Sequence, residues 1–224
     1  MTIAERWVEI RARVEAAAER AGHAVTIIAV SKTHPAEAVR AAAAAGATDF
    51  GENYAQELAT KRADCGDVRW HFIGRLQRNK AKLVAGQVAL VHACDSVELA
   101  IELAKRANGT LQPVLLALAG EDSKAGATAE TVGALARGVA AVPGIRLDGL
   151  MTMPPPADDP EASRPAFEGL RALRDRLRDD LGMALPVLSM GMSGDFEVAI
   201  ACGATHVRIG TAIFGSRQRG DGVA

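Results

Sequence analysis

The sequence has few cysteines, a single tyrosine and no long apolar run. Its three cysteines, Cys65, Cys94 and Cys202, are widely spaced and form no C-x-x-C pair, which excludes the common zinc and dithiol motifs. We therefore expect three reduced thiols and a cytoplasmic protein. Charges are spread through the N-terminal segment, and no apolar stretch reaches the roughly 20 residues of a membrane span. We expect neither a signal peptide nor a membrane anchor.

An excess of charge of one sign is also lacking. The 26 basic and 27 acidic residues give a net charge of −1 at pH 7, so the composition does not favour nucleic acid or an anionic membrane as a partner. Hydrophobic residues make up 49% of the chain and charged residues 24%, which is the balance of an ordinary globular protein. Lysine is scarce among the basic residues, because 20 are arginine and six are lysine.

Strand-like and helical segments alternate along the chain. Eight strand-like runs, most of them apolar, occur at residues 24–30, 48–53, 69–74, 89–94, 113–119, 145–153, 186–190 and 205–210. Each run precedes a segment that we predict to be helical, and eight such units in little over 200 residues favour an α/β fold of the (β/α)8 (TIM) barrel type. A doubly wound open sheet is the alternative, but the segment AVSKTHP lacks the glycine-rich turn of that fold.

The whole chain, residues 1–224, is predicted to form one barrel domain. Residues 1–22 are predicted to be a leading amphipathic helix, and residues 218–224 a disordered tail. The basic segment at residues 75–82 is predicted to be the solvated face of a helix, and residues 128–142 another helix.

Lys32 is the first candidate functional residue, because it comes two residues after the first apolar run. The carboxyl ends of barrel strands carry the active site of such enzymes. A partly desolvated lysine there has a lowered pKa and can act as a nucleophile, whereas arginine stays protonated. The alternative is a lysine that ends a strand and points into water.

A candidate anion site follows the last two strand-like runs. Glycines at 191 and 194 surround Ser193, which we expect to be the N-cap of the next helix, and Gly210 and Thr211 begin a short turn. Backbone N–H groups at such positions bind phosphate, and many barrel enzymes hold a phosphate there. Two routine helix caps are the alternative interpretation.

Arg208 lies within the apolar run THVRIG and shares a strand face with Gly210. A charged residue in a buried strand either faces a site or is paired. We predict that Arg208 faces the anion site, with a structural salt bridge as the alternative. Together with Lys32, it suggests a phosphorylated carbonyl ligand. Pyridoxal phosphate and a sugar phosphate of a Schiff-base aldolase both fit.

Two further groups of residues have an ordinary structural explanation. His71 and His206 have no evident clustered partners, so we expect a structural role for both. Four methionines lie at strand ends and are predicted to line the pocket or to fill the core: Met151, Met153, Met190 and Met192.

Five motifs in register are characteristic of a known family. AVSKTHP, DFGENYAQE, WHFIGRLQRNK, LDGLMTM and LSMGMSGDFEVAIACGATHVRIGTAIFG together resemble the YggS/PROSC family of pyridoxal phosphate (PLP) homeostasis proteins, over about residues 25–217. The resemblance implies a barrel like the N-terminal domain of alanine racemase, with PLP bound at its mouth. The segment LLALAGEDSKAG departs from the family pattern at residues 115–120.

The resemblance also implies roles for individual residues. Lys32 matches the lysine that forms the Schiff base with PLP. Ser193, Gly210 and Thr211 match the phosphate contacts, Arg208 matches the arginine that faces the pyridine nitrogen, and Asn53 matches an asparagine near the cofactor. No metal is implied.

The function implied is PLP binding for intracellular homeostasis, in a monomer that passes cofactor to apo-enzymes. Two observations argue against catalytic turnover. Arg208 does not exchange a proton, so the pyridine nitrogen it faces stays unprotonated and is a weak electron sink. The sequence also offers no second base, since its only tyrosine is Tyr54. A PLP-dependent amino-acid racemase or lyase is the alternative.

Overall fold

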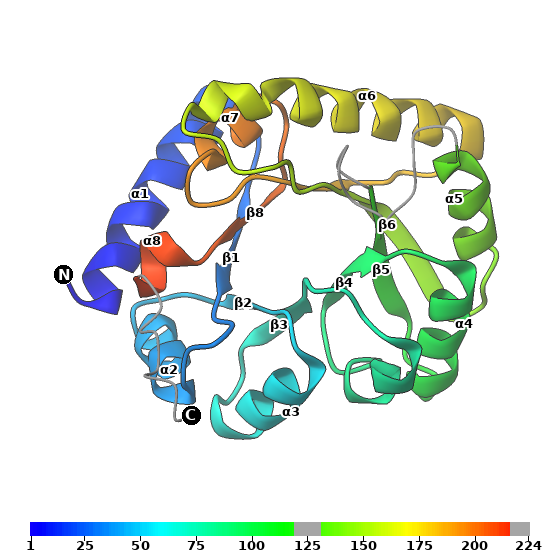
Figure 1. Cartoon of the computed structure of the whole chain (residues 1–224), viewed down its shortest axis with the longest axis horizontal. Helices are drawn as coiled ribbons and strands as arrows, with labels where there is room; N and C mark the ends of the chain where they lie inside the picture. Colours follow the sequence, from blue (N-terminus) through cyan, green and yellow to red (C-terminus); the bar gives the residue numbers. More distant parts are fainter. Residues whose placement is uncertain (119–130, 216–224) are drawn as a thin grey trace, which may run out of the picture.

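Eight parallel strands close into a barrel that is surrounded by helices (Figure 1). The computed structural model describes residues 1–118 and 131–215. The strands are β1 Thr26–Val30, β2 Asp49–Glu52, β3 Arg69–Phe72, β4 Leu90–Cys94, β5 Gln112–Ala117, β6 Ile145–Met151, β7 Val187–Ser189 and β8 His206–Ile209. Each strand pairs with the next along the chain, and β8 pairs with β1. The predicted barrel is confirmed, and the open doubly wound sheet is wrong.

The helices follow the predicted alternation. They are α1 Ile3–Ala21, α2 Ala36–Ala44, α3 Ala55–Asp64, α4 Val97–Arg106, α5 Val132–Ala140, α6 Arg164–Leu181, α7 Phe196–Ala201 and α8 Thr211–Phe214, with 3-10 helices η1 Arg78–Leu83 and η2 Pro160–Ser163. The leading helix α1 packs against α2, α7 and α8 beside the β1–β8 seam (Figure 1). It begins with a capping box between Thr2 and Glu5 and ends at Gly22, where φ is 73°.

The main apolar core lies between the helices and the outer face of the barrel. Helix α6 shows how the sequence produces it, because Phe167, Leu170, Leu173 and Leu177 recur at helical spacing and are all buried. Burying one such side chain contributes roughly 1.5–3 kcal/mol. On β8, Val207 and Ile209 belong to this core, so the intervening Arg208 faces the barrel interior.

One helix prediction is wrong in type. The basic segment forms the six-residue 3-10 helix η1, in which Ala81 is the buried residue. A longer α-helix would need an apolar stripe to bury, and this segment lacks one. Of the helix predicted over residues 128–142, the described part forms α5 from Val132 to Ala140. Residues 128–130, the tail at 218–224 and the end of the 115–120 segment lie outside the described residues.

No helix within residues 1–118 and 131–215 combines the length and apolar character that a bilayer span requires. In this barrel the carboxyl ends of all eight strands point to one side of the molecule, since the strands are parallel. The loops that follow the strands therefore meet around one opening.

Candidate functional site

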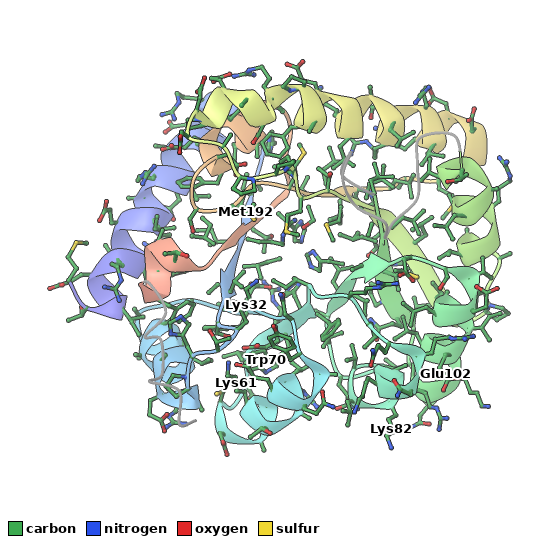
Figure 2. All side chains as sticks on the ribbon, viewed as in Figure 1. Lys32, Lys61, Trp70, Lys82, Glu102 and Met192 are labelled. Carbon is green, nitrogen blue, oxygen red and sulfur yellow. The ribbon has the colours of Figure 1, made fainter. Side chains whose placement is uncertain are left out.

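A cavity of about 510 Å³ opens where the strands end. The six residues predicted for the site all line it: Lys32, Asn53, Ser193, Arg208, Gly210 and Thr211. Lys32 and Met192 lie over the ring of strands, whereas Lys82 and Glu102 lie at the outer edge of the molecule (Figure 2). The fold thus brings together residues that follow β1, β2 and β7 with residues on and after β8.

The loop that carries Lys32 is fixed from two sides. The Ser31 N–H donates to the Gly51 carbonyl at 3.1 Å, which continues the pairing of β1 with β2. The next residue but one, Thr33, has φ of 67°, and its N–H donates to Glu57 Oε1 on α3 at 2.6 Å. Lys32 lies between these two anchors, so the backbone that presents its amine to the cavity is well defined.

A buried ion cluster lies behind this loop, and sequence reasoning missed it. Lys61 on α3 donates from Nζ to the Ser31 carbonyl, to Glu52 Oε1 and to Glu57 Oε1, each at 2.7 Å. The Ser31 hydroxyl also donates to Glu52 Oε1, at 2.6 Å. Glu52 is completely buried, and its Oε2 has no hydrogen-bond partner within the described part of the chain.

Burial dominates the electrostatics of this cluster. Desolvation raises the pKa of Glu52 although Lys61 and Ser31 donate hydrogen bonds to its carboxylate. The signal in the sequence was a glutamate on the outward, helix-facing side of a buried strand, nine residues before a lysine on the following helix. The lysine and the glutamate together tie α3 to the loop that carries Lys32.

The predicted anion site is formed by two turns that face each other. The N–H groups of Ser193 and Gly194 donate to no acceptor within residues 1–118 and 131–215, so both remain available to a ligand. Beyond Gly194 there is open space, because a Cβ built there has no neighbour within 4 Å. Position 191 requires glycine, because its φ is 91° and a Cβ there would lie 2.6 Å from the Ala199 methyl.

Ser193 is not the helix N-cap that the sequence suggested. Asp195 is the N-cap of α7, and its Oδ1 accepts from the Met192 N–H at 2.6 Å. The Ser193 hydroxyl reaches across to α8 instead and accepts from the Ala212 N–H at 3.3 Å. Aspartate is an equally common residue at the N-cap position, although here the Asp195 side chain makes no hydrogen bond to the first turn of α7. Ser193 therefore links the two turns of the anion site.

Arg208 forms part of the cavity floor and is 5% exposed. Its guanidinium donates to Ser189 Oγ at 2.6 Å and to the Thr152 carbonyl at 2.9 Å. Desolvation lowers the pKa of Arg208 to about 10, although nearby Asp195 opposes the shift, so the group remains charged at neutral pH. No ion pair of Arg208 occurs within the described ranges, so the alternative interpretation of Arg208, a structural salt bridge, is not observed there.

Other lining residues extend the predicted set. Met151, Met153 and Met192 line the cavity, whereas Met190 packs into the core. Ala117 and Leu118, within the segment that departs from the family pattern, form part of the apolar wall of the cavity.

Sequence reasoning missed two charged lining residues, Arg75 and Asp95, whose side chains approach to 3.7 Å. They follow β3 and β4, so the strand-end rule that identified Lys32 would have found them.

The prediction that His71 and His206 lack clustered partners is wrong. Both lie near His92, with ring centroids 5.2 Å apart for His71 and His92 and 6.2 and 6.3 Å from His206 to the other two. The clustering brings together β3, β4 and β8, which are far apart in the sequence. No group of His, Cys, Asp and Glu that could hold a metal ion occurs in residues 1–118 and 131–215.

Comparison with known proteins identifies relatives over nearly the whole chain. Residues 8–218 match the family described as alanine racemase, N-terminal domain. The pyridoxal phosphate homeostasis protein of Pseudomonas aeruginosa is 45% identical over 228 residues, which cover 98% of this chain and 97% of the relative. The protein of the same name from Aquifex aeolicus is 44% identical, with 97% of this chain and 100% of the relative covered.

A solved structure agrees with these relatives. PipY of Synechococcus elongatus, determined with PLP bound, superposes with a TM-score of 0.85 at 34% identity. The alignment covers 96% of this chain and 100% of PipY.

Proposed function

The chain belongs to the pyridoxal phosphate homeostasis protein family, whose barrel is that of the alanine racemase N-terminal domain, and on this basis we propose that it binds PLP for intracellular PLP homeostasis. The observation that carries the proposal is the convergence of Lys32, Arg208 and the anion site on one cavity. A primary amine, a fixed cation and free backbone donors match the aldehyde, ring and phosphate of PLP. The PLP-bound structure of PipY supports the same ligand.

The cavity also fits PLP in its donor chemistry. The Ser193 and Gly194 N–H groups lack protein acceptors among the described residues and face open space, which suits a dianionic phosphate. Gly210 and Thr211 complete the wall on the α8 side. Arg208 is already held by Ser189 and Thr152, and the rest of its five donors remain for the cavity. We assign Asn53 a supporting polar contact.

Lys32 is the residue that we propose to hold the cofactor covalently. When PLP is bound, its aldehyde supplies a carbon that condenses with the Lys32 amine, with loss of one water, to give a Schiff base. Lys32 supplies the nucleophilic amine, and the anchored Ser31 and Thr33 hold its backbone at the cavity rim. Arg208 keeps its own proton and therefore provides charge but no proton to the cofactor ring.

The phosphate assignment predicts the behaviour of Ser193 variants. Ser193→Asp places a carboxylate beside the phosphate, and two such charges about 4 Å apart repel by about 4 kcal/mol at an effective dielectric constant of 20. We expect the dissociation constant for PLP, measured by absorbance titration, to rise at least about 100-fold. Ser193→Ala is the control, because it removes one hydroxyl without adding charge and should cost less than about tenfold. Equal losses in the two variants would contradict the assignment.

We further propose that the protein carries PLP without significant amino-acid turnover. Racemisation at an amino-acid Cα needs acid–base groups on both faces of the bound substrate. Tyr54, the only tyrosine, is 57% exposed and does not line the cavity. Within the described cavity wall the one carboxylate is that of Asp95. Asp95 is therefore the residue to test as a second base.

Exchange of the Cα hydrogen for solvent deuterium distinguishes the carrier from the racemase or lyase alternative. With PLP-loaded protein and a panel of amino acids, we expect exchange no faster than with free PLP at the same concentration. Asp95→Asn should leave this rate unchanged. Exchange well above the free-PLP rate that is lost in Asp95→Asn would favour the enzyme instead.

A further inference from the structure

A continuous chain of hydrogen bonds crosses the barrel interior and ends at Arg208. It starts at Asp49, the first residue of β2, which accepts from Arg69 at 2.9 and 2.7 Å. Asp49 Oδ1 lies 3.0 Å from His71 Nε2, and His71 Nδ1 lies 3.0 Å from His92 Nε2. His92 Nδ1 lies 2.8 Å from Ser189 Oγ, which accepts from Arg208 at 2.6 Å.

This series of hydrogen bonds lies inside the barrel and away from solvent. His92 belongs to β4 and Ser189 to β7, and these strands are not neighbours in the sheet, so their contact crosses the interior. Both residues are completely buried, and His71 is 3% exposed. One end approaches the surface where Asp49, Arg69 and His71 line a small cavity of about 200 Å³ at the amino ends of the strands, and at the other end Arg208 lines the candidate site. Barrel interiors are more commonly filled by Val, Ile and Leu.

The partners determine which ring nitrogens carry hydrogen. Burial raises the pKa of Asp49, but hydrogen bonds from His71 and Arg69 outweigh it and leave this pKa well below its ordinary value. Asp49 is therefore an acceptor, and His71 donates to it from Nε2–H. Burial lowers the pKa of His92 well below its ordinary value, and the charge of Arg208 acts in the same direction, so His92 is neutral.

One arrangement satisfies every group in the chain. His92 donates from Nε2–H to the bare Nδ1 of His71, and the Ser189 hydroxyl donates to the bare Nδ1 of His92. Ser189 Oγ then offers only its lone pairs to Arg208. If His92 instead donated to Ser189, the hydroxyl hydrogen of Ser189 would have no acceptor in this series of hydrogen bonds and would be free to turn toward Arg208. All hydrogens thus point from Arg208 toward the Asp49 carboxylate.

We propose that His92, His71 and Asp49 are positioning residues for Arg208, acting through Ser189. They hold the Ser189 hydroxyl in the one rotation that accepts from the guanidinium, and so fix the orientation that Arg208 presents to the cavity. The inference rests on the proposed function in one respect, namely that Arg208 faces the ring of bound PLP. The chain of hydrogen bonds itself exists independently of that ligand.

The wild-type protein without cofactor provides the first test. Long-range ¹H–¹⁵N correlation spectra of histidine-labelled protein at pH 7.5 report which ring nitrogen of each histidine carries hydrogen. We expect Nε2–H with a bare Nδ1 in both His71 and His92. An Nδ1–H form of either ring, or a doubly protonated His92, would overturn the proposal.

A pair of matched variants provides the second test, in PLP-loaded protein. His92→Phe breaks the chain, so we expect a shifted absorption maximum of the bound cofactor and a dissociation constant for PLP raised about tenfold. Gln112→Leu is the control, because Gln112 is also buried and hydrogen-bonded, to Gly86 N–H at 2.9 Å, but does not line the cavity. Gln112→Leu should alter neither the absorption maximum nor the dissociation constant, although it also removes a buried hydrogen bond.

The outcomes separate the two claims. Identical spectra and affinities in His92→Phe and wild type would overturn the positioning role. Absence of PLP binding by wild type would overturn the proposed function, while the nitrogen spectra still decide whether the chain has the proposed direction. If His92→Phe does not fold, the spectra of the wild type remain decisive.

Discussion

Lys32→Ala is expected to abolish covalent attachment of PLP completely. Lys32 is the only lysine among the described residues that line the cavity. The amine of the ion cluster behind the loop, Lys61 Nζ, is buried and donates to three oxygen acceptors at 2.7 Å. Lys61 does not line the cavity, and its hydrogen bonds hold it against Glu52, Glu57 and Ser31. The variant should therefore lose the long-wavelength absorbance of wild-type protein mixed with PLP.

Lys32→Arg is the matched control for charge. Arginine preserves a positive side chain of similar length but does not deprotonate, so it cannot condense with an aldehyde. Both variants should still bind PLP weakly and reversibly through Arg208 and the anion site, as ultrafiltration at increasing PLP concentrations would detect. Retention of the long-wavelength band in either variant would contradict the role of Lys32.

Lys61→Met is expected to have the largest effect on stability. Glu52 is completely buried and the Lys61 side chain is 6% exposed. Removing one partner of a buried ion pair leaves the other uncompensated and typically costs about 3–5 kcal/mol. The Ser31 carbonyl loses its Lys61 donor at the same time. Urea unfolding of wild type and variant measures the difference in the free energy of unfolding.

The control for this variant is Lys82→Met, which changes an exposed lysine at the outer edge of the molecule (Figure 2). It should alter stability by no more than about 0.5 kcal/mol. Adding Glu52→Gln to Lys61→Met should recover part of the loss, because it removes the buried charge. A loss below about 1 kcal/mol in Lys61→Met would show that the ion cluster does not stabilise the fold.

The stability deficit of Lys61→Met should also depend on pH. Burial raises the pKa of Glu52 in the folded protein, and loss of Lys61 removes an opposing interaction. The folded state then binds a proton more tightly than the unfolded chain. The stability deficit should therefore narrow as the pH falls toward the pKa of Glu52 in the unfolded chain, about 4.5. It should widen as the pH rises through the pKa of Glu52 in the folded variant.

Strand order and the strand-end residues could be predicted from the sequence because they depend on local pattern. The alternation in THVRIG predicted that Arg208 and Gly210 share a face, and both line the cavity. The type of η1 and the cap of α7 could not be predicted reliably. The type of η1 depended on the absence of an apolar stripe. The N-cap of α7 depended on a choice between Ser193 and Asp195, which are comparably common at that position.

The interior contacts were beyond sequence reasoning for a different reason. His92 and Ser189 are 97 positions apart and meet only because the barrel closes. Without the register of the strands, His71 and His206 are isolated polar residues in apolar runs. The pairing of Glu52 with Lys61 depends likewise on how α3 packs behind β2. Such contacts are set by tertiary structure and not by local pattern.

Reduction of the protein with borohydride in the presence of PLP tests the central claim most directly. Borohydride converts a Schiff base into a stable secondary amine, so the modified lysine can be located by peptide mass mapping. We predict one cofactor per chain, attached at Lys32, with none of the other five lysines modified in stoichiometric amount. No adduct, or a stoichiometric adduct on another lysine, would contradict the account.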